Sequence, residues 1–130
     1  MSDGLKTHNV LVVDDSPTMR RMVSTSLRLL SSIKSTEAGN GLEAIERLAV
    51  EPVDLMILDL NMPDMHGIEV IDFVRGHHAY KHIPIVVLTT KSEDESRAQA
   101  LAAGASRYLT KPFDPKYLAE TVGSLLEETN

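Results

Sequence analysis

The segment VLVVDD at residues 10–15 sets a pattern that recurs along the chain. Four apolar residues in a row are followed directly by two aspartates. LMILD at residues 55–59 repeats the arrangement, with four apolar residues followed by a single aspartate. A third apolar run, at residues 83–88, ends before a threonine. Strands that are apolar on every residue are typically buried on both faces, as in a parallel sheet. We therefore expect these runs, and weaker ones at residues 33–36 and 106–110, to form such a sheet.

The segments between these runs have the spacing of amphipathic helices. Ser16-Pro17 is typical of a helix start. Apolar stripes with steps of mostly three or four residues are expected to face the sheet: Met19, Met22, Val23, Leu27 and Leu30; Leu42, Ile45, Leu48 and Ala49; Ile71 and Val74; Ala98, Leu101 and Ala102; and Leu118, Val122 and Leu125. Strand and helix alternate five times, which predicts an α/β fold with a doubly wound, five-stranded parallel sheet and right-handed crossovers.

Size and composition narrow the class of protein. A chain of 130 residues suits one domain, 1–130, with its core at about 9–126. It contains no cysteine, which excludes disulfides, thiolate metal sites and cysteine nucleophiles. A net charge of −6 disfavours a nucleic-acid partner. Since no apolar run approaches about 20 residues and residues 1–8 lack a signal-peptide core, we expect a cytoplasmic protein with no membrane partner.

Polar residues follow four of the predicted strands. Asp14, Asp15, Asp59, Thr89 and Lys111 all stand where a strand ends. In an open parallel sheet these positions share the carboxyl edge, where ligands bind. A helix cap or a turn would explain each residue singly, but not their joint placement. Three carboxylates repel one another unless a cation intervenes, and oxygen ligands without thiolates favour Mg²⁺ or Mn²⁺. Because Mg²⁺ usually keeps places for water and phosphate oxygens, the pocket is expected to receive a phosphoryl group.

Five motifs resemble the receiver domain of two-component response regulators. They are VLVVDD at 10–15, EAGNGLEA at 37–44, LDLNMPDMHG at 58–67, VLTT at 87–90 and YLTKPF at 108–113. The resemblance covers about residues 9–126, and DDSPTMRR at 14–21 is most similar to the stand-alone, CheY-like chemotaxis type. It implies a flavodoxin-like (βα)5 fold with strand order 2-1-3-4-5, the order known for flavodoxin and CheY.

The resemblance also implies how phosphate is received. Asp59 would be the phosphoacceptor, taking a phosphoryl group from a sensor histidine kinase or a phosphotransfer protein. Asp15, Asp59 and the backbone carbonyl of Asn61 would ligate Mg²⁺ directly, and Asp14 would act through a water molecule. Lys111, next to an expected cis peptide bond to Pro112, would neutralise the transferring oxygens together with the metal.

A further implication of the resemblance concerns the response. Thr89 would move to hydrogen-bond the phosphoryl group, and Tyr108 would follow it inward from an exposed rotamer. The fourth helix, fifth strand and fifth helix would then change their affinity for a downstream protein. A monomer is expected, without enzyme activity beyond self-phosphotransfer and autodephosphorylation. Arg20, Arg21 and Arg28 are interpreted as a solvent-exposed helix face.

Three other functions share parts of the pattern. A haloacid-dehalogenase-like, Mg²⁺-dependent phosphohydrolase would use Asp59 as nucleophile, but it normally needs an Asp two residues later, where this chain has Asn61. A flavodoxin-type flavin protein shares the topology, but Asp14 and Asp15 would repel the FMN phosphate. A receiver that acts as an interaction module without phosphorylation is the third, although all the acceptor residues are present.

Overall fold

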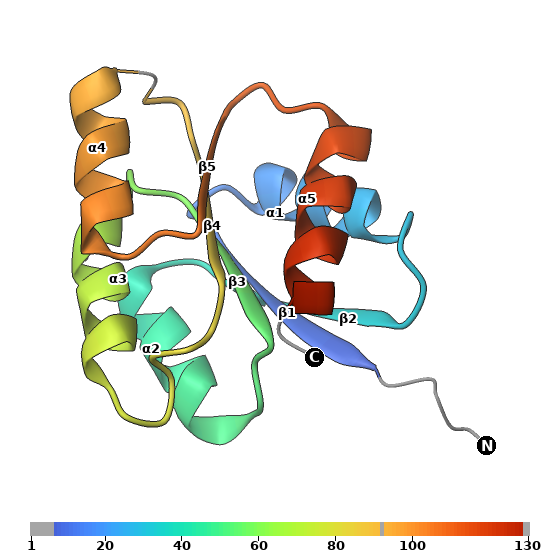
Figure 1. The fold of residues 1–130 in the computed structure, drawn as a ribbon, viewed down its shortest axis with the longest axis horizontal. Coiled ribbons are helices and arrows are strands. Elements are labelled where there is room, and N and C mark those ends of the chain that lie inside the picture. Colours follow the sequence, from blue (N-terminus) through green and yellow to red (C-terminus); the bar gives the residue numbers. More distant parts are fainter. Residues whose placement is uncertain (1–6, 92, 129–130) are drawn as a thin grey trace.

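Five parallel strands form one sheet, and each strand is followed by a helix (Figure 1). The computed structural model describes residues 7–91 and 93–128. The strands are β1 (His8–Val13), β2 (Ile33–Ala38), β3 (Leu55–Leu58), β4 (Ile85–Thr89) and β5 (Arg107–Thr110). The helices are α1 (Pro17–Leu27), α2 (Gly41–Val50), α3 (Gly67–Gly76), α4 (Asp94–Ala103) and α5 (Pro115–Glu128). The strand order is β2-β1-β3-β4-β5, so the expected fold class and strand order are confirmed.

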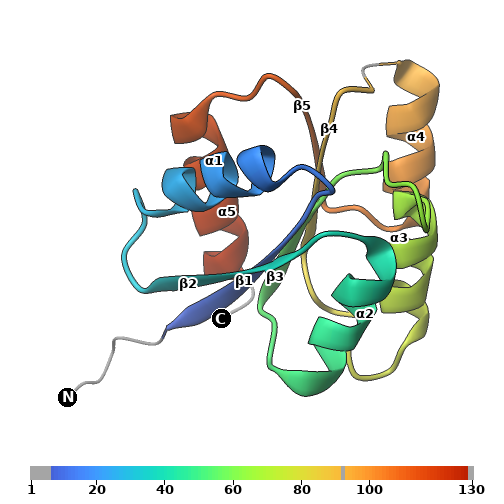
Figure 2. The same ribbon diagram turned by 180° about the vertical axis from the view of Figure 1, so that it is seen from behind.

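The helices cover both faces of the sheet. Helices α1 and α5 lie on one face, and α2, α3 and α4 lie on the other (Figures 1 and 2). Successive residues of β1 enter different cores: Val10 and Val12 join the cluster with α1 and α5, whereas Leu11 and Val13 join the cluster with α2 and α3. This alternation explains why a strand that is buried on both faces has no polar residue between its apolar ones.

The predicted helix faces are correct in the centre and wrong at the margins. Val23 and Leu27 are buried as expected, but Met22 is 51% exposed and Leu42 is 57% exposed. In α4 the buried residue is Ala100, and the predicted stripe of Ala98, Leu101 and Ala102 lies on the exposed side. Alanine stands at positions 98, 100, 102 and 103 of this helix, which lie on more than one face, so the apolar spacing does not distinguish one face from another.

Two further observations bear on the expectations from sequence. The peptide bond between Lys111 and Pro112 is cis, as the resemblance implied. Within the described part of the chain, no helix is both long enough and apolar enough to cross a membrane. The expected single domain spans residues 1–130. Its two terminal segments, 1–6 and 129–130, lie outside the described residues.

The start of α2 is capped by a carboxylate from a distant loop. Asp64, between β3 and α3, accepts hydrogen bonds from the backbone N–H groups of Gly41 (3.2 Å) and Leu42 (3.1 Å). Asn40 accepts the next one, from Glu43 (2.8 Å). Burial acts to raise the pKa of Asp64, but backbone hydrogen bonds, including those from Leu42 and Gly41, together outweigh it and lower that pKa below its ordinary value of 3.8. The contact therefore fixes the loop that follows β3 to a helix more than 20 residues earlier.

We expect Asp64→Asn to lower the free energy of unfolding at pH 7 by about 0.5–1 kcal/mol, the low end for a helix cap because the carboxylate is exposed. A carboxyl group whose pKa is lowered on folding stabilises the protein above its ordinary pKa. The difference from wild type should therefore shrink as the pH falls through the folded-state pKa. Urea unfolding between pH 7 and pH 3 tests this. Asp72→Asn, an exposed carboxylate on α3, is the control, and equal losses in both variants would contradict the cap.

Candidate functional site

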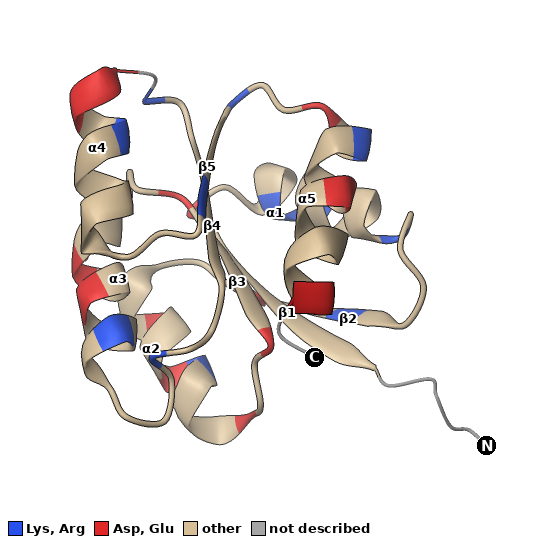
Figure 3. Cartoon of the chain, viewed as in Figure 1, with Lys and Arg blue, Asp and Glu red and all other residues tan. Residues whose placement is uncertain are grey.

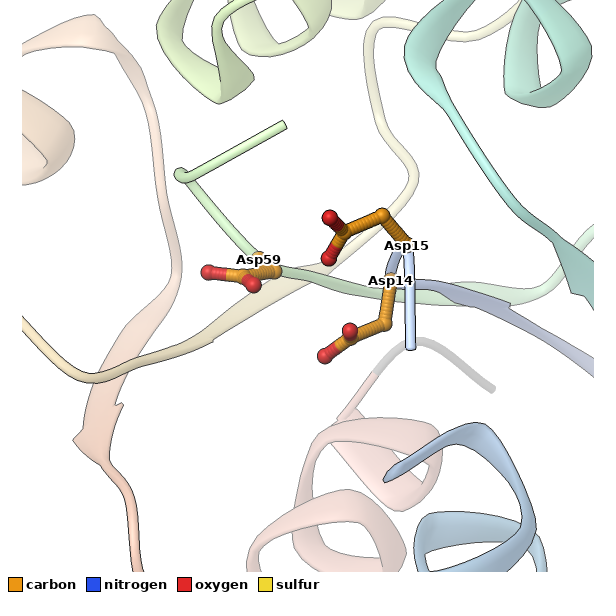
Figure 4. A group of neighbouring side chains, drawn as sticks. All are labelled: Asp14, Asp15 and Asp59. Carbon is orange, nitrogen blue, oxygen red and sulfur yellow. The ribbon is translucent and has the colours of Figure 1, made fainter. Parts of the chain in front are cut away.

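Three carboxylates meet at the carboxyl edge of the sheet. Asp14 and Asp15 follow β1, and Asp59 follows β3. Because β1 and β3 are paired up to Val13 and Leu58, the residues that come next are neighbours. Each side chain offers one oxygen within 4.8 Å of the others, and Figure 4 shows all three extending toward the same side. Asp14 and Asp59 are buried, whereas Asp15 is exposed, so the cluster is open to solvent at one side.

A lysine from the end of β5 joins two of these carboxylates. Lys111 Nζ lies 2.7 Å from Asp14 Oδ2 and 3.2 Å from Asp59 Oδ2, and its side chain is largely buried. Its backbone N–H donates to the carbonyl of Thr89 (2.8 Å), which continues the pairing of β5 with β4. Burial acts to lower the pKa of Lys111, but the hydrogen bonds and charges of Asp14 and Asp59 outweigh it and raise that pKa. The ammonium is therefore charged at neutral pH.

The second oxygen of each buried carboxylate accepts a backbone hydrogen bond. Asp14 Oδ1 accepts from the N–H of Ser16 (2.9 Å), and Asp59 Oδ1 accepts from the N–H of Asn61 (3.1 Å). Asn61 directs its side-chain amide to Thr90 Oγ1 (3.4 Å). Three carboxylates against one ammonium leave two negative charges in the pocket. In charge and in donor type, this acidic pocket fits a hard divalent cation such as Mg²⁺.

Thr89 and Tyr108 lie on β4 and β5, the two strands beyond β3 in the sheet. Thr89 is fully buried, and its Oγ1 is 3.5 Å from the backbone nitrogen of Lys91. Tyr108 donates its phenol O–H to the carbonyl of Lys91 (2.6 Å), and the guanidinium of Arg97 lies 5.6 Å from the centre of its ring. Lys91 thus contacts both residues through its backbone.

The expected exposed rotamer of Tyr108 is wrong. The residue is 5% exposed and belongs to the core cluster on the α3 and α4 side of the sheet. Burial, with the charges of Glu93 and Asp59, raises the pKa of its phenol, and the charge of Arg97 opposes this in part. The carbonyl of Lys91 supplies the partner that a buried phenol needs, which is why the inward rotamer is stable here.

Sequence reasoning missed one residue of the site. Arg20 was expected on a solvent-exposed face, as Arg21 and Arg28 are, but its guanidinium turns back to the loop after β1. Arg20 Nη1 donates to the carbonyl of Asp14 (2.6 Å), and Nε donates to Glu37 Oε1 (2.8 Å). Glu37 is 17 residues away, so no local spacing in the sequence marks this contact.

Comparison with known proteins agrees with this geometry. Residues 10–123 match the family of the response regulator receiver domain. The chemotaxis protein CheY1 of Helicobacter pylori is 40% identical over 118 residues, which is 90% of this chain and 95% of that protein. CheY-3 of Vibrio cholerae is 35% identical over 122 residues, 94% of each chain.

The solved structures give the same result. The chemotaxis response regulator CheY4 of Vibrio cholerae superposes with a TM-score of 0.84 at 37% identity, covering 92% of this chain and 99% of that one. The family match spans most of the chain. The two relatives named above are CheY proteins, and the match to each covers nearly its whole length. The chain therefore belongs to the response regulator receiver family and is of the CheY type.

Proposed function

We propose that this protein is a response regulator whose Asp59 carboxylate accepts a phosphoryl group from a phosphohistidine of a sensor kinase or a phosphotransfer protein. The observation that carries this is the place of Asp59 in the sheet. It follows β3, which lies between β1 and β4, so Asp14 and Asp15 stand on one side of it and Thr89 and Lys111 on the other. Asp59 shares the acidic cluster with Asp14 and Asp15, and its Oδ2 lies 3.2 Å from Lys111 Nζ.

The transfer needs little covalent chemistry from the protein. An oxygen of Asp59 attacks phosphorus in line, and the P–N bond to the donor imidazole breaks with its electron pair going to the nitrogen. The imidazole leaves and takes up a proton from solvent. Lys111 places its charge on the oxygens of the transferring group, while the buried edge of the sheet holds Asp59 in position. No general base is needed, because a carboxylate nucleophile has no proton to lose when it attacks.

The acidic pocket would hold the metal that this reaction requires. Asp15, Asp59 and the backbone carbonyl of Asn61 would bind Mg²⁺ directly, and Asp14, which is held by Lys111, would act through a water molecule. When bound, the ion supplies positive charge to the phosphoryl oxygens. A phosphohydrolase is disfavoured, because the residue two positions after Asp59 carries an amide that is directed to Thr90 and has no acid to offer.

The signal would leave the site through Lys91. Thr89 Oγ1 faces the N–H of Lys91, and the carbonyl of Lys91 holds the phenol of Tyr108 on β5. A phosphoryl group that attracts the hydroxyl of Thr89 therefore disturbs the same loop that holds Tyr108. The affected surface would be formed by α4, β5 and α5, and a downstream protein would bind there. The protein would act as a monomer whose core spans residues 9–126. Figure 3 shows acidic residues at the start of α4, where Asp94 and Glu95 form the first turn.

The first prediction concerns the acceptor. With Mg²⁺ and acetyl phosphate, wild-type protein should gain one phosphoryl group, and Asp59→Asn should gain none, because the attacking carboxylate is gone. Intact-protein mass spectrometry measures the uptake. Asp72→Asn serves as the control and should be labelled like wild type. Labelling of Asp59→Asn to the wild-type level would refute the assignment, and so would full labelling of wild type in excess EDTA.

The second prediction separates the roles of the acidic pair. Asp15→Ala should weaken Mg²⁺ binding, measured by isothermal titration calorimetry, more than Asp14→Ala does, because Asp15 would be a direct ligand. Metal-free stability should move in opposite directions. Removing the exposed Asp15 relieves repulsion between like charges, whereas removing Asp14 takes from Lys111 its 2.7 Å partner. A reversed order of Mg²⁺ affinities would contradict these roles.

The third prediction tests the route through Thr89. Thr89→Ala should still be phosphorylated, but the amide resonances of β5 and α5 should shift much less than in wild type when beryllium fluoride and Mg²⁺ are added, because the hydroxyl that responds to the phosphoryl oxygens is missing. Thr25→Ala, a change at an exposed threonine on α1, should respond like wild type. NMR shifts of Arg107–Thr110 that are as large in Thr89→Ala as in wild type would disprove the route.

A further inference from the structure

The carboxylate of Asp15 differs from the other two in how it is held. Asp14 and Asp59 each accept a backbone N–H on one oxygen and the ammonium of Lys111 on the other. Among the residues that the structure describes, none forms a hydrogen bond or an ion pair with the Asp15 side chain. The direction of this side chain therefore depends on the backbone of the turn from which it extends.

That turn is fixed by Arg20. The Asp14 carbonyl belongs to the planar peptide unit that leads into Asp15, so the orientation of this carbonyl sets the orientation of the Asp15 Cα. Arg20 Nη1 donates to this carbonyl at 2.6 Å. Arg20 lies in α1, 17% exposed, and the first turn of that helix is itself fixed by the Ser16 cap, whose hydroxyl accepts from Met19 (3.2 Å).

The other end of the contact lies on the sheet. Arg20 Nε donates to Glu37 Oε1 at 2.8 Å, and Glu37 is paired in register with Val12 where β2 runs beside β1. One planar guanidinium thus joins the turn after β1 to the end of β2. Because the charge of Glu37 balances that of Arg20, the pair adds little net electrostatic field to the acidic pocket. The effect of the pair on the pocket is therefore geometric.

We propose that Arg20 is a positioning residue for the cation site: it holds the peptide unit before Asp15, with Glu37 as its support, so that the Asp15 carboxylate faces Asp59. The inference rests on the proposed function, since it assigns Arg20 a role in Mg²⁺ binding. It assigns no contact between Arg20 and the metal or the phosphoryl group.

The test uses a double variant that keeps the net charge. Arg20→Met with Glu37→Gln removes one positive and one negative charge and deletes both contacts at similar side-chain volume. The dissociation constant for Mg²⁺ alone, measured calorimetrically on unphosphorylated protein, should rise about tenfold, the low end of the loss that follows removal of a group supporting a metal ligand. Arg21→Met, a change at the adjacent exposed arginine, should bind Mg²⁺ within about twofold of wild type, because a lone surface charge is largely screened.

Two single variants test the same contacts separately. Arg20→Lys keeps the charge but loses the planar fork, so it should bind Mg²⁺ more weakly than wild type and more tightly than the double variant. Glu37→Gln leaves the contact from Arg20 to Asp14 in place but removes the carboxylate that supports Arg20. We expect Mg²⁺ affinity to fall about threefold, which is less than the loss typical for removing a group that supports a metal ligand. Amide exchange at Asp15 and Ser16 in metal-free protein should accelerate in the same order, whereas that of the α5 core should not.

The outcomes separate the two proposals. If wild type binds Mg²⁺ and the double variant and both single variants bind it equally well, the role of Arg20 is refuted and the proposed function stands. If wild type itself fails to bind Mg²⁺, the proposed function fails and this inference fails with it. A double variant that does not fold shifts the decision to Arg20→Lys and Glu37→Gln, where wild-type affinity in both would refute the inference.

Discussion

The ammonium of Lys111, buried at the end of β5, joins the carboxylates that end β1 and β3. Taking an ammonium and two carboxylates out of water is costly, and the cost is offset only because each charge has a close partner and each buried carboxylate accepts a further backbone hydrogen bond. The contact ties together three strands that are far apart in the sequence. The relative positions of Asp14 and Asp59 in the acidic pocket therefore depend on the Lys111 ammonium.

The same contact leaves the pocket incompletely neutralised. Two negative charges remain when Lys111 is counted against the three carboxylates, and Asp15 holds its charge in the open side of the pocket. A phosphoryl group would add about −1.5 to −2 charge at this point. In the proposed function, a divalent cation would offset this charge excess before a phosphoryl group adds to it, which is a physical reason for coupling metal binding to phosphorylation. The fold tolerates the excess because the uncompensated carboxylate is the exposed one.

The parts of the structure that sequence predicted well are those controlled by burial along one strand. The runs before Asp14, Asp59 and Thr89 are apolar on every residue because both faces of the sheet are covered, and the chemistry at their ends follows from the parallel arrangement. Contacts between distant segments were not predictable in this way. Arg20 on α1 contacts Glu37 on β2, and Asp64 in the loop after β3 caps Gly41, through the packing of segments whose separation in sequence carries no local signal.

Tyr108 illustrates the consequence of missing a contact of this kind. From sequence, its response is a movement from an exposed to a buried rotamer, but the phenol is already buried against the carbonyl of Lys91. A side chain that is already inside cannot report phosphorylation by moving inside. In the proposed mechanism, the change at α4, β5 and α5 must therefore come from the loop that carries Lys91, since this loop contacts Thr89 on one side and Tyr108 on the other. Any change in the rotamer of Tyr108 is then a result of the movement of this loop and not its cause.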